Sequence, residues 1–241
     1  MKLITCGDSY MSPRIHFEGT HFTEIFASKL GFDLITYSRA AMSNGGIALQ
    51  LLQAIEDKPN LIIFNLTFCD RIEFPLDASL QMKPTQKDLF YKYEPPLELS
   101  TINGHPGNLV SDNIASILSD HPNSHSLIYP KEKIEAVRTY FNELYSTNWK
   151  YLSDCMTMYS ILHVLHRSGI DYIMYCDNLR LTELQKTPFK TDWIDSKNNI
   201  SNAMKEYISR PAPNNTGYHT SIETQADIAE YVINHYNKYF K

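Results

Sequence analysis

The sequence lacks a long apolar run, and cysteine is scarce in it. No run approaches the roughly 18 apolar residues that a membrane-spanning helix needs, and the opening residues, MKLIT, have none of the architecture of a signal peptide. We therefore expect no membrane partner and a cytoplasmic location. The 4 cysteines lie far apart with no CxxC pair, which predicts reduced thiols and no zinc cluster. We expect no metal and no cofactor.

An excess of basic charge is also absent. The 241 residues include 22 Lys and Arg against 27 Asp and Glu, a formal net charge of -5, which argues against nucleic acid as the main partner. No glycine-rich phosphate loop follows the first expected strand, so nucleotide binding is weakly supported. The chain does have 43% hydrophobic residues, with 16 Tyr and 11 Phe, which is enough to build a core. The composition leaves the oligomeric state open.

The first part of the chain alternates between apolar patterns of two kinds. Helical spacing predicts helices over 21–31, where Gly31 is the stop, and over 45–58. Short apolar runs predict three strands, over 2–6, 32–38 and 60–66. Strands and helices that alternate with short joints are typical of a parallel sheet covered by helices on both faces, with right-handed crossovers.

The alternation of predicted strands and helices stops in the middle of the chain. Residues 71–130 hold seven of the chain's 12 prolines and show only weak periodicity, so we expect an irregular, lid-like insertion there. Beyond it, the pattern predicts one strand over 170–177 and helices over 130–146, 149–169, about 196–208 and from Thr220 or Ser221 onward. The whole chain, 1–241, is predicted to be one α/β domain with a parallel sheet of about five strands.

A turn with the sequence GDS, at 7–9, follows the first expected strand at once. Ligands of open parallel sheets bind outside the carboxyl ends of the strands, where strand order reverses, and Ser9 is expected there. A Ser hydroxyl is a poor nucleophile until a base takes its proton. His219 lies in a loop leading into the last helix and is expected at the same edge, although a helix-terminal His beside capping residues explains it equally well. His16 and His21 flank the first loop, and nothing singles them out.

Two further segments are expected at this edge, RAAMSNGG at 39–46 and TFCDR at 67–71. Asn44 and Gly45 are residue types that tolerate positive φ, so a backbone N–H can turn inward there. An N–H aimed at a developing oxyanion lowers the barrier by about 3 kcal/mol in enzymes that use one. Ser-Asn-Gly-Gly is also a good generic loop and helix cap, and the sequence leaves both interpretations open.

These blocks resemble the SGNH (GDSL-like) hydrolases, a family of serine esterases, lipases, thioesterases and carbohydrate deacetylases. The GDS at 7–9 matches the family's first block, and HTSIETQADIAEYV at 219–232 resembles its last. The resemblance implies a flavodoxin-like three-layer α/β/α sandwich with strand order 2-1-3-4-5, Ser9 as nucleophile and oxyanion donor, and His219 as general base. A divergent branch met in bacteriophage and environmental bacterial sequences is the most similar, through a TxxxRxEF stretch at 67–74.

The chain departs from the family pattern in the two blocks that complete the oxyanion hole. The second-block Gly falls on Asn44, which keeps the backbone N–H. The third-block Asn, whose side-chain amide is a donor in the family, falls on Cys69. Thr67 and Asn65 are the nearby replacements for that amide, although neither matches the motif.

A third departure concerns the residue that orients the base. The family's Asp, three residues before the His, falls on Thr216. Losing such an Asp costs about 10⁴ in rate in a triad enzyme. Asn214, Asn215, Thr216 or a backbone carbonyl is left to orient His219, and a Ser9–His219 dyad is expected to be slow.

The resemblance therefore implies a serine hydrolase that cleaves an ester, either an O-acyl group on a carbohydrate or a small ester, through an acyl-enzyme. The expected partner is that small-molecule or glycan ester. The alternative is a catalytically weakened SGNH-fold binding or structural module, such as a phage-encoded one associated with a virion. The predicted site consists of the catalytic pair Ser9 and His219, the oxyanion and pocket residues Asp8, Asn44, Gly45, Thr67, Cys69 and Arg71, and the His-orienting candidates Asn215 and Thr216.

Overall fold

The computed structural model describes residues 1–13, 18–38, 42–67, 71–75, 99–103, 139, 143–144, 146–176, 197–210 and 220–241. The strands are β1 (Lys2–Cys6), β2 (Asp33–Thr36), β3 (Leu61–Asn65), β4 (Arg71–Pro75), β5 (Leu99–Asn103) and β6 (Asp171–Tyr175). The helices are the 3-10 turn η1 (Ser9–Met11), α1 (Phe22–Leu30), α2 (Asn44–Glu56), α6 (Thr147–Ser168), α8 (Ser201–Ile208) and α9 (Ile222–Tyr239). Within these ranges, no helix has the length and hydropathy that crossing a membrane requires.

The main sheet has the order β2-β1-β3-β6, and all its neighbours pair in parallel. Ile4 of β1 lies opposite both Ile35 of β2 and Ile62 of β3, so β1 is an interior strand. The chain leaves β1 for β2 on one side and for β3 on the other, which makes the end of β1 the switch point of the sheet. The predicted parallel α/β architecture is confirmed, with the order predicted for the first four strands.

The expected fifth strand is reduced to a single bridge in the part of the chain that the structure describes. Asn199 forms a parallel bridge with Met174 of β6, and Ile200 N donates to Met174 O at 2.9 Å. The extended segment ends there because the Asn199 side chain turns the chain: its Oδ1 accepts from Ser201 N at 2.9 Å. Helix α8 then begins at once. Among the described residues, the main sheet therefore has 4 strands where about five were predicted.

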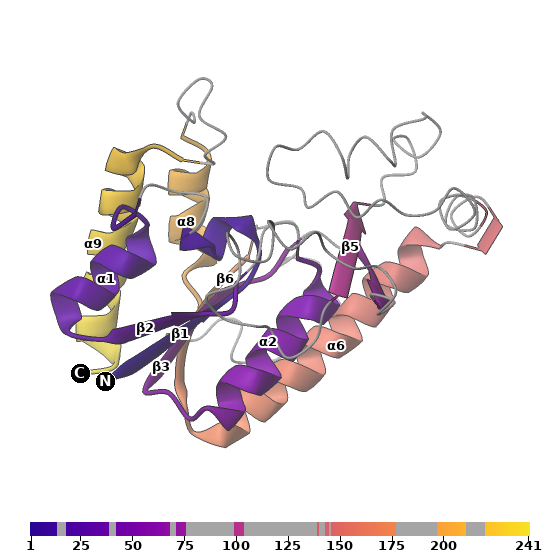
Figure 1. The fold of residues 1–241 in the computed structure, drawn as a ribbon, viewed down its shortest axis with the longest axis horizontal. Helices are drawn as coiled ribbons and strands as arrows, with labels where there is room; N and C mark the ends of the chain where they lie inside the picture. The colour runs from indigo at the N-terminus through magenta and orange to yellow at the C-terminus, as the bar shows by residue number, and fades with distance from the viewer. Residues whose placement is uncertain are drawn as a thin grey trace, which may run out of the picture.

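Helices cover both faces of this sheet, which gives three layers (Figure 1). Alternate residues of a strand point to opposite faces. Ile4 and Ile62 belong to a buried core with side chains of α2 and α6. Leu3 and Ile63 belong to a second core with side chains of α1, α8 and α9. Burial of these two apolar faces holds the sheet between its helices and fixes the strand register.

The predicted helix stops are confirmed. Helix α1 ends at Gly31, with φ 70°, and α6 ends at Gly169, with φ 72°. Both glycines adopt the left-handed conformation that terminates helices. Of the two residues predicted to cap the last helix, Ser221 is the N-cap, and its side chain accepts from Thr224 N at 3.1 Å.

The expected insertion contains regular structure. Strands β4 and β5 pair antiparallel, with Arg71 opposite Asn103 and Pro75 opposite Leu99. The prediction that 71–130 is irregular is therefore wrong for these two segments. Each segment has little periodicity of its own, and each forms its ladder of backbone hydrogen bonds with the other. A local sequence pattern does not reveal such pairing. The rest of 71–130, and most of the helix expected over 130–146, lies outside the described residues.

Candidate active site

Ser9 lies directly beyond the carboxyl end of β1, as the first residue of the turn η1. The turn begins because Asp8 is its N-cap: the Asp8 carboxylate accepts from Tyr10 N at 3.0 Å. Ser9 is 8% exposed. A serine is thereby held at the switch point of the sheet by local structure that the GDS sequence itself supplies.

Gly7 allows the chain to leave β1 at this angle. Its φ is 143°, a conformation that side chains rarely adopt, and its N–H donates to Gln50 Oε1 of α2 at 2.6 Å. A Cβ at this position would lie 1.9 Å from Asn65 Oδ1 and 2.8 Å from Met11 Cγ. The turn that carries Ser9 therefore requires glycine, for both conformation and space.

The Asp8 carboxylate anchors the turn and is not exposed for chemistry. Asp8 is 1% exposed, and besides Tyr10 N its oxygens accept from Asn65 Nδ2 at 2.8 Å and from Thr67 Oγ1 at 2.6 Å. Asn65 Oδ1 in turn accepts from Asp8 N at 3.0 Å. Buried polar oxygens need such hydrogen-bond donors in place of water. The end of β3 thus fixes the Ser9 turn from the neighbouring strand.

These bonds use the protons of Thr67 and Asn65, the side chains expected to replace the missing third-block amide as oxyanion donors. The single hydroxyl proton of Thr67 is donated to Asp8. Both Nδ2 protons of Asn65 are donated, one to Asp8 and one to Leu66 O at 3.4 Å. Neither side chain has a proton left for an oxyanion without breaking a buried hydrogen bond.

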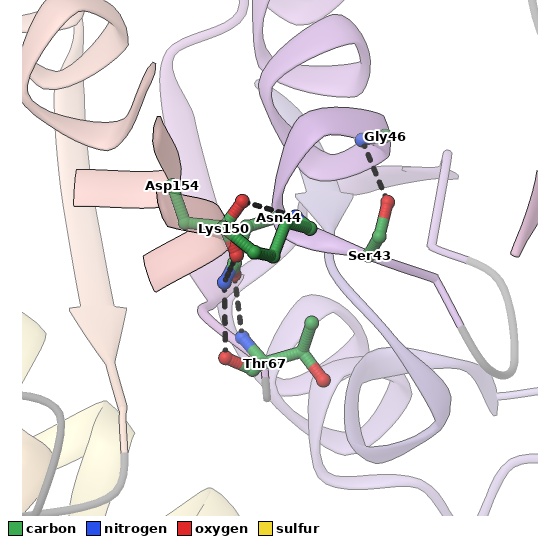
Figure 2. A network of polar contacts seen from close by, with 6 residues as sticks. All are labelled: Ser43, Asn44, Gly46, Thr67, Lys150 and Asp154. Atoms are coloured by element: carbon green, nitrogen blue, oxygen red, sulfur yellow. Dashed lines mark hydrogen bonds and ion pairs between the residues drawn. The ribbon is translucent and has the colours of Figure 1, made fainter. Parts of the chain in front are cut away.

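Asn44 is the first residue of α2, and its side chain joins three elements (Figure 2). Its amide Oδ1 accepts from Thr67 N at 2.9 Å, and its Nδ2 donates to Thr67 O at 3.1 Å and to Asp154 Oδ2 of α6 at 3.0 Å. Asp154 also forms a partly buried ion pair with Lys150, one turn earlier in α6. The Asn44 side chain is therefore structural, and what α2 presents at this edge is its N-terminal backbone.

Asn44 and Gly45 do not use the positive φ that their residue types tolerate, and the segment is instead the helix cap that the sequence also allowed. Both are helical residues in the first turn of α2, which Ser43 caps by accepting from Gly46 N at 3.2 Å. Inward turning of an N–H does not need positive φ at this position, because the first N–H groups of any helix point out of its N-terminus. Asn44 and Gly45 supply such groups, on the positive end of the helix dipole.

A second set of hydrogen bonds reaches this edge from the last helix. Gln225 of α9 accepts from Phe22 N of α1 at 2.8 Å and donates to Thr220 Oγ1 at 2.5 Å. His21, the N-cap of α1, contacts Tyr10 O through Nε2 at 3.1 Å. Thr220 is thus connected to the turn that carries Ser9. Sequence reasoning noted His21 without singling it out, and it missed Gln225 and Gln50, whose partners are distant along the chain.

The remaining predicted residues are described only in part. His219, Cys69, Asn215 and Thr216 lie outside the described residues. Arg71 is the first residue of β4, where it lies opposite Asn103 of β5. The structure brings together Ser9, Asp8, Asn44, Gly45 and Thr67 at one edge of the sheet.

Burial sets the ionisation of two groups beside the turn. Tyr175 of β6 donates its hydroxyl to Tyr10 O at 3.4 Å, and burial, followed by the nearby Asp8, raises the pKa of Tyr175 well above 10.0. Burial also raises the pKa of the Cys6 thiol well above 9.0, so this thiol is not a nucleophile near neutral pH. In the described ranges, no group of three or more His, Cys, Asp or Glu side chains is arranged to hold a metal ion.

The fold and the site define an α/β protein whose polar residues meet at the carboxyl edge of a parallel sheet. No protein-family model matches the chain, and no curated protein matches it. The crystal structure of an acetyl xylan esterase, AlAXEase, is similar to it over 96% of this chain and 98% of that one, at 8% sequence identity and a TM-score of 0.48. A likeness at this level carries no inference about substrate or catalytic residues.

Proposed function

We propose that this chain is a serine hydrolase of the SGNH type that cleaves an ester, either an O-acyl group on a carbohydrate or a small ester. Ser9 is the nucleophile and His219 is the general base. The observation that carries the proposal is the position of Ser9. It opens a turn at the switch point of a parallel sheet, and a buried, fully hydrogen-bonded Asp8 fixes that turn.

In the proposed reaction, Ser9 Oγ attacks the ester carbonyl carbon while His219 takes the hydroxyl proton. His219 then gives this proton to the leaving alkoxide as the carbon–oxygen bond breaks, which leaves an acyl-enzyme on Ser9. Water attacks the acyl carbon while His219 takes a proton from it. His219 then returns this proton to Ser9 Oγ as the bond between the acyl carbon and Oγ breaks, which releases the acid and restores the serine hydroxyl. Atoms and charge balance without a metal or a redox partner.

The oxyanion of this reaction is stabilised by backbone donors. The side-chain protons of Thr67 and Asn65 are already donated to Asp8 and to a backbone carbonyl. The side chain of Asn44 is held by Thr67 and Asp154. We therefore assign the oxyanion to the backbone N–H groups of Ser9 and of Asn44, where the dipole of α2 adds to their effect.

The experiment that tests the proposal compares Ser9→Ala with Ser160→Ala. Ser160 is an exposed serine of α6 whose hydroxyl donates to Met156 O of its own helix, so it is a matched control. With p-nitrophenyl acetate and acetylated glycans, we expect Ser9→Ala to lower kcat by about 10³-fold or more and Ser160→Ala to leave it unchanged. Equal activity of Ser9→Ala and the unaltered chain would remove Ser9 from the mechanism.

A fluorophosphonate probe tests the base. We expect stoichiometric labelling of Ser9 that is lost in His219→Ala, because an unactivated serine hydroxyl reacts poorly. An unaltered chain that neither hydrolyses these esters nor takes up the probe would reject the enzyme and favour the binding or structural module instead.

A further inference from the structure

The N-terminus of α1 lies between the two segments that carry the proposed catalytic pair. One segment is the turn of Ser9, and the other leads into α9 and contains Thr220, the residue that follows His219. Helices α1 and α9 lie side by side on one face of the sheet (Figure 1). Hydrogen bonds from the first two residues at this helix end, His21 and Phe22, reach both segments.

His21 is an unusual cap, because it uses both nitrogens of its ring. Nδ1 accepts from Thr23 N at 3.3 Å and lies 2.7 Å from Thr23 Oγ1, which is the capping interaction. Nε2 lies 3.1 Å from Tyr10 O, and since a carbonyl only accepts, Nε2 carries the proton and donates it. Ser, Thr, Asn or Asp would cap the helix as well. Only the longer ring also reaches the residue next to Ser9.

Gln225 makes the corresponding connection on the other side. Its Oε1 accepts from Phe22 N, an N–H of the first turn of α1 that has no acceptor within its own helix. Its Nε2 donates to Thr220 Oγ1. Gln225 and Thr220 are both buried. Both ends of the amide are therefore committed, and α1 is joined to the start of α9.

We propose that His21 and Gln225 are positioning residues that set the separation between Ser9 and the His219 loop, an inference that rests on the proposed function. The connection runs from Tyr10 O through the His21 ring, the Phe22 backbone and the Gln225 amide to Thr220. A nucleophile and its base must lie within hydrogen-bond reach, and a misplacement of about 1 Å costs about 10²-fold in rate. Residues at opposite ends of the chain need such a connection.

The test uses conservative variants, two of which each remove one hydrogen bond of this connection, while a third keeps it. Thr220→Val removes the hydroxyl that accepts from Gln225 and keeps the branched shape, whereas Thr220→Ser keeps the hydroxyl. His21→Asn keeps a good N-cap and loses the reach to Tyr10 O. With p-nitrophenyl acetate, we expect Thr220→Val and His21→Asn to lower kcat by about 10- to 100-fold with KM within about threefold. Thr220→Ser should keep the kcat of the unaltered chain.

The outcomes separate this inference from the proposed function. Full activity of Ser9→Ala would reject the proposed function itself. Loss of activity in Ser9→Ala, together with equal kcat in Thr220→Val and Thr220→Ser, would overturn only the positioning role of Gln225. Hydrogen exchange of the amides at 9–12 is a readout without substrate: it should become faster in His21→Asn, and unchanged exchange would overturn the role of His21. Circular dichroism checks that each variant is folded. If Thr220→Val is unfolded, the kcat and hydrogen exchange of His21→Asn test the proposal instead.

Discussion

Gly7→Ala is the substitution for which the structure gives the sharpest expectation. The new Cβ would lie 1.9 Å from Asn65 Oδ1, the atom that accepts from Asp8 N. It would also force alanine into a φ of 143°. Both effects act on the turn that carries Ser9, so the change is expected to reduce stability and the reactivity of Ser9 together.

The size of the effect follows from two contributions. A residue other than glycine in this backbone region costs about 1 to 3 kcal/mol. Displacing the Asn65 amide removes a hydrogen bond to a buried carboxylate, and bonds to charged groups contribute about 1.5 to 3 kcal/mol each. The sum is about 3 to 6 kcal/mol, a large part of the roughly 5 to 15 kcal/mol by which domains are stable. At about 2 to 4 °C per kcal/mol for a chain of this length, the expected fall in Tm is about 6 to 24 °C.

The matched control is Gly31→Ala. Gly31 also has positive φ, at 70°, but a Cβ there would meet nothing within 4 Å. It carries the backbone strain alone, about 1 to 2 kcal/mol. Urea and thermal unfolding of both variants isolate the clash at Gly7 as the difference between them. If the free energies of unfolding of Gly7→Ala and Gly31→Ala differ by less than about 1 kcal/mol, the account of this turn is refuted. Differences between variants of one protein are more reliable than absolute values.

Two further predictions concern buried hydroxyls. Burial raises the pKa of Tyr172 from 10.0 to about 12, and in the described part of the chain its hydroxyl has no hydrogen-bond partner. The folded state favours the protonated phenol, so this contribution to stability is complete below pH 10 and lost as the pH rises through 12. As the pH rises from 10 to 12, the free energy of unfolding in urea should fall less for Tyr172→Phe than for the unaltered chain. An equal fall in both would contradict this. Thr67→Val should cost about 1 to 3 kcal/mol, because the Asp8 carboxylate loses a donor at 2.6 Å. Thr67→Ser should restore the stability, and two equally stable variants would show that this bond contributes nothing.

Much of the fold could be predicted from local pattern. The short apolar run at 2–6 is β1, and the helical spacing over 149–169 is α6. Gly31 and Gly169 stop their helices because glycine adopts the left-handed conformation at little cost. The alternation of strand and helix predicted the parallel sheet, since parallel strands need crossovers. Features set by neighbours along the chain were within reach of sequence reasoning.

The expected fifth strand and the irregular insertion show where local pattern fails. At the sheet edge, the Asn199 side chain bonds to Ser201 N and ends the extended segment after one bridge. In the insertion, the segments at 71–75 and 99–103 become strands only because they pair with each other. Such pairing depends on partners that a single segment does not encode.

The candidate site also has one part that local sequence sets and another that contacts between distant residues set. The Ser9 turn follows from local sequence, since GDS after an apolar run supplies the glycine, the cap and the serine within three residues. The groups that surround this turn come together only in the folded chain. Asn65 and Asp8 are 57 residues apart, Asn44 and Asp154 are 110 apart, and Phe22 and Gln225 are 203 apart. The physical reason is that short-range periodicity reports burial, whereas hydrogen bonds between buried polar groups form only when packing brings distant segments together and excludes water.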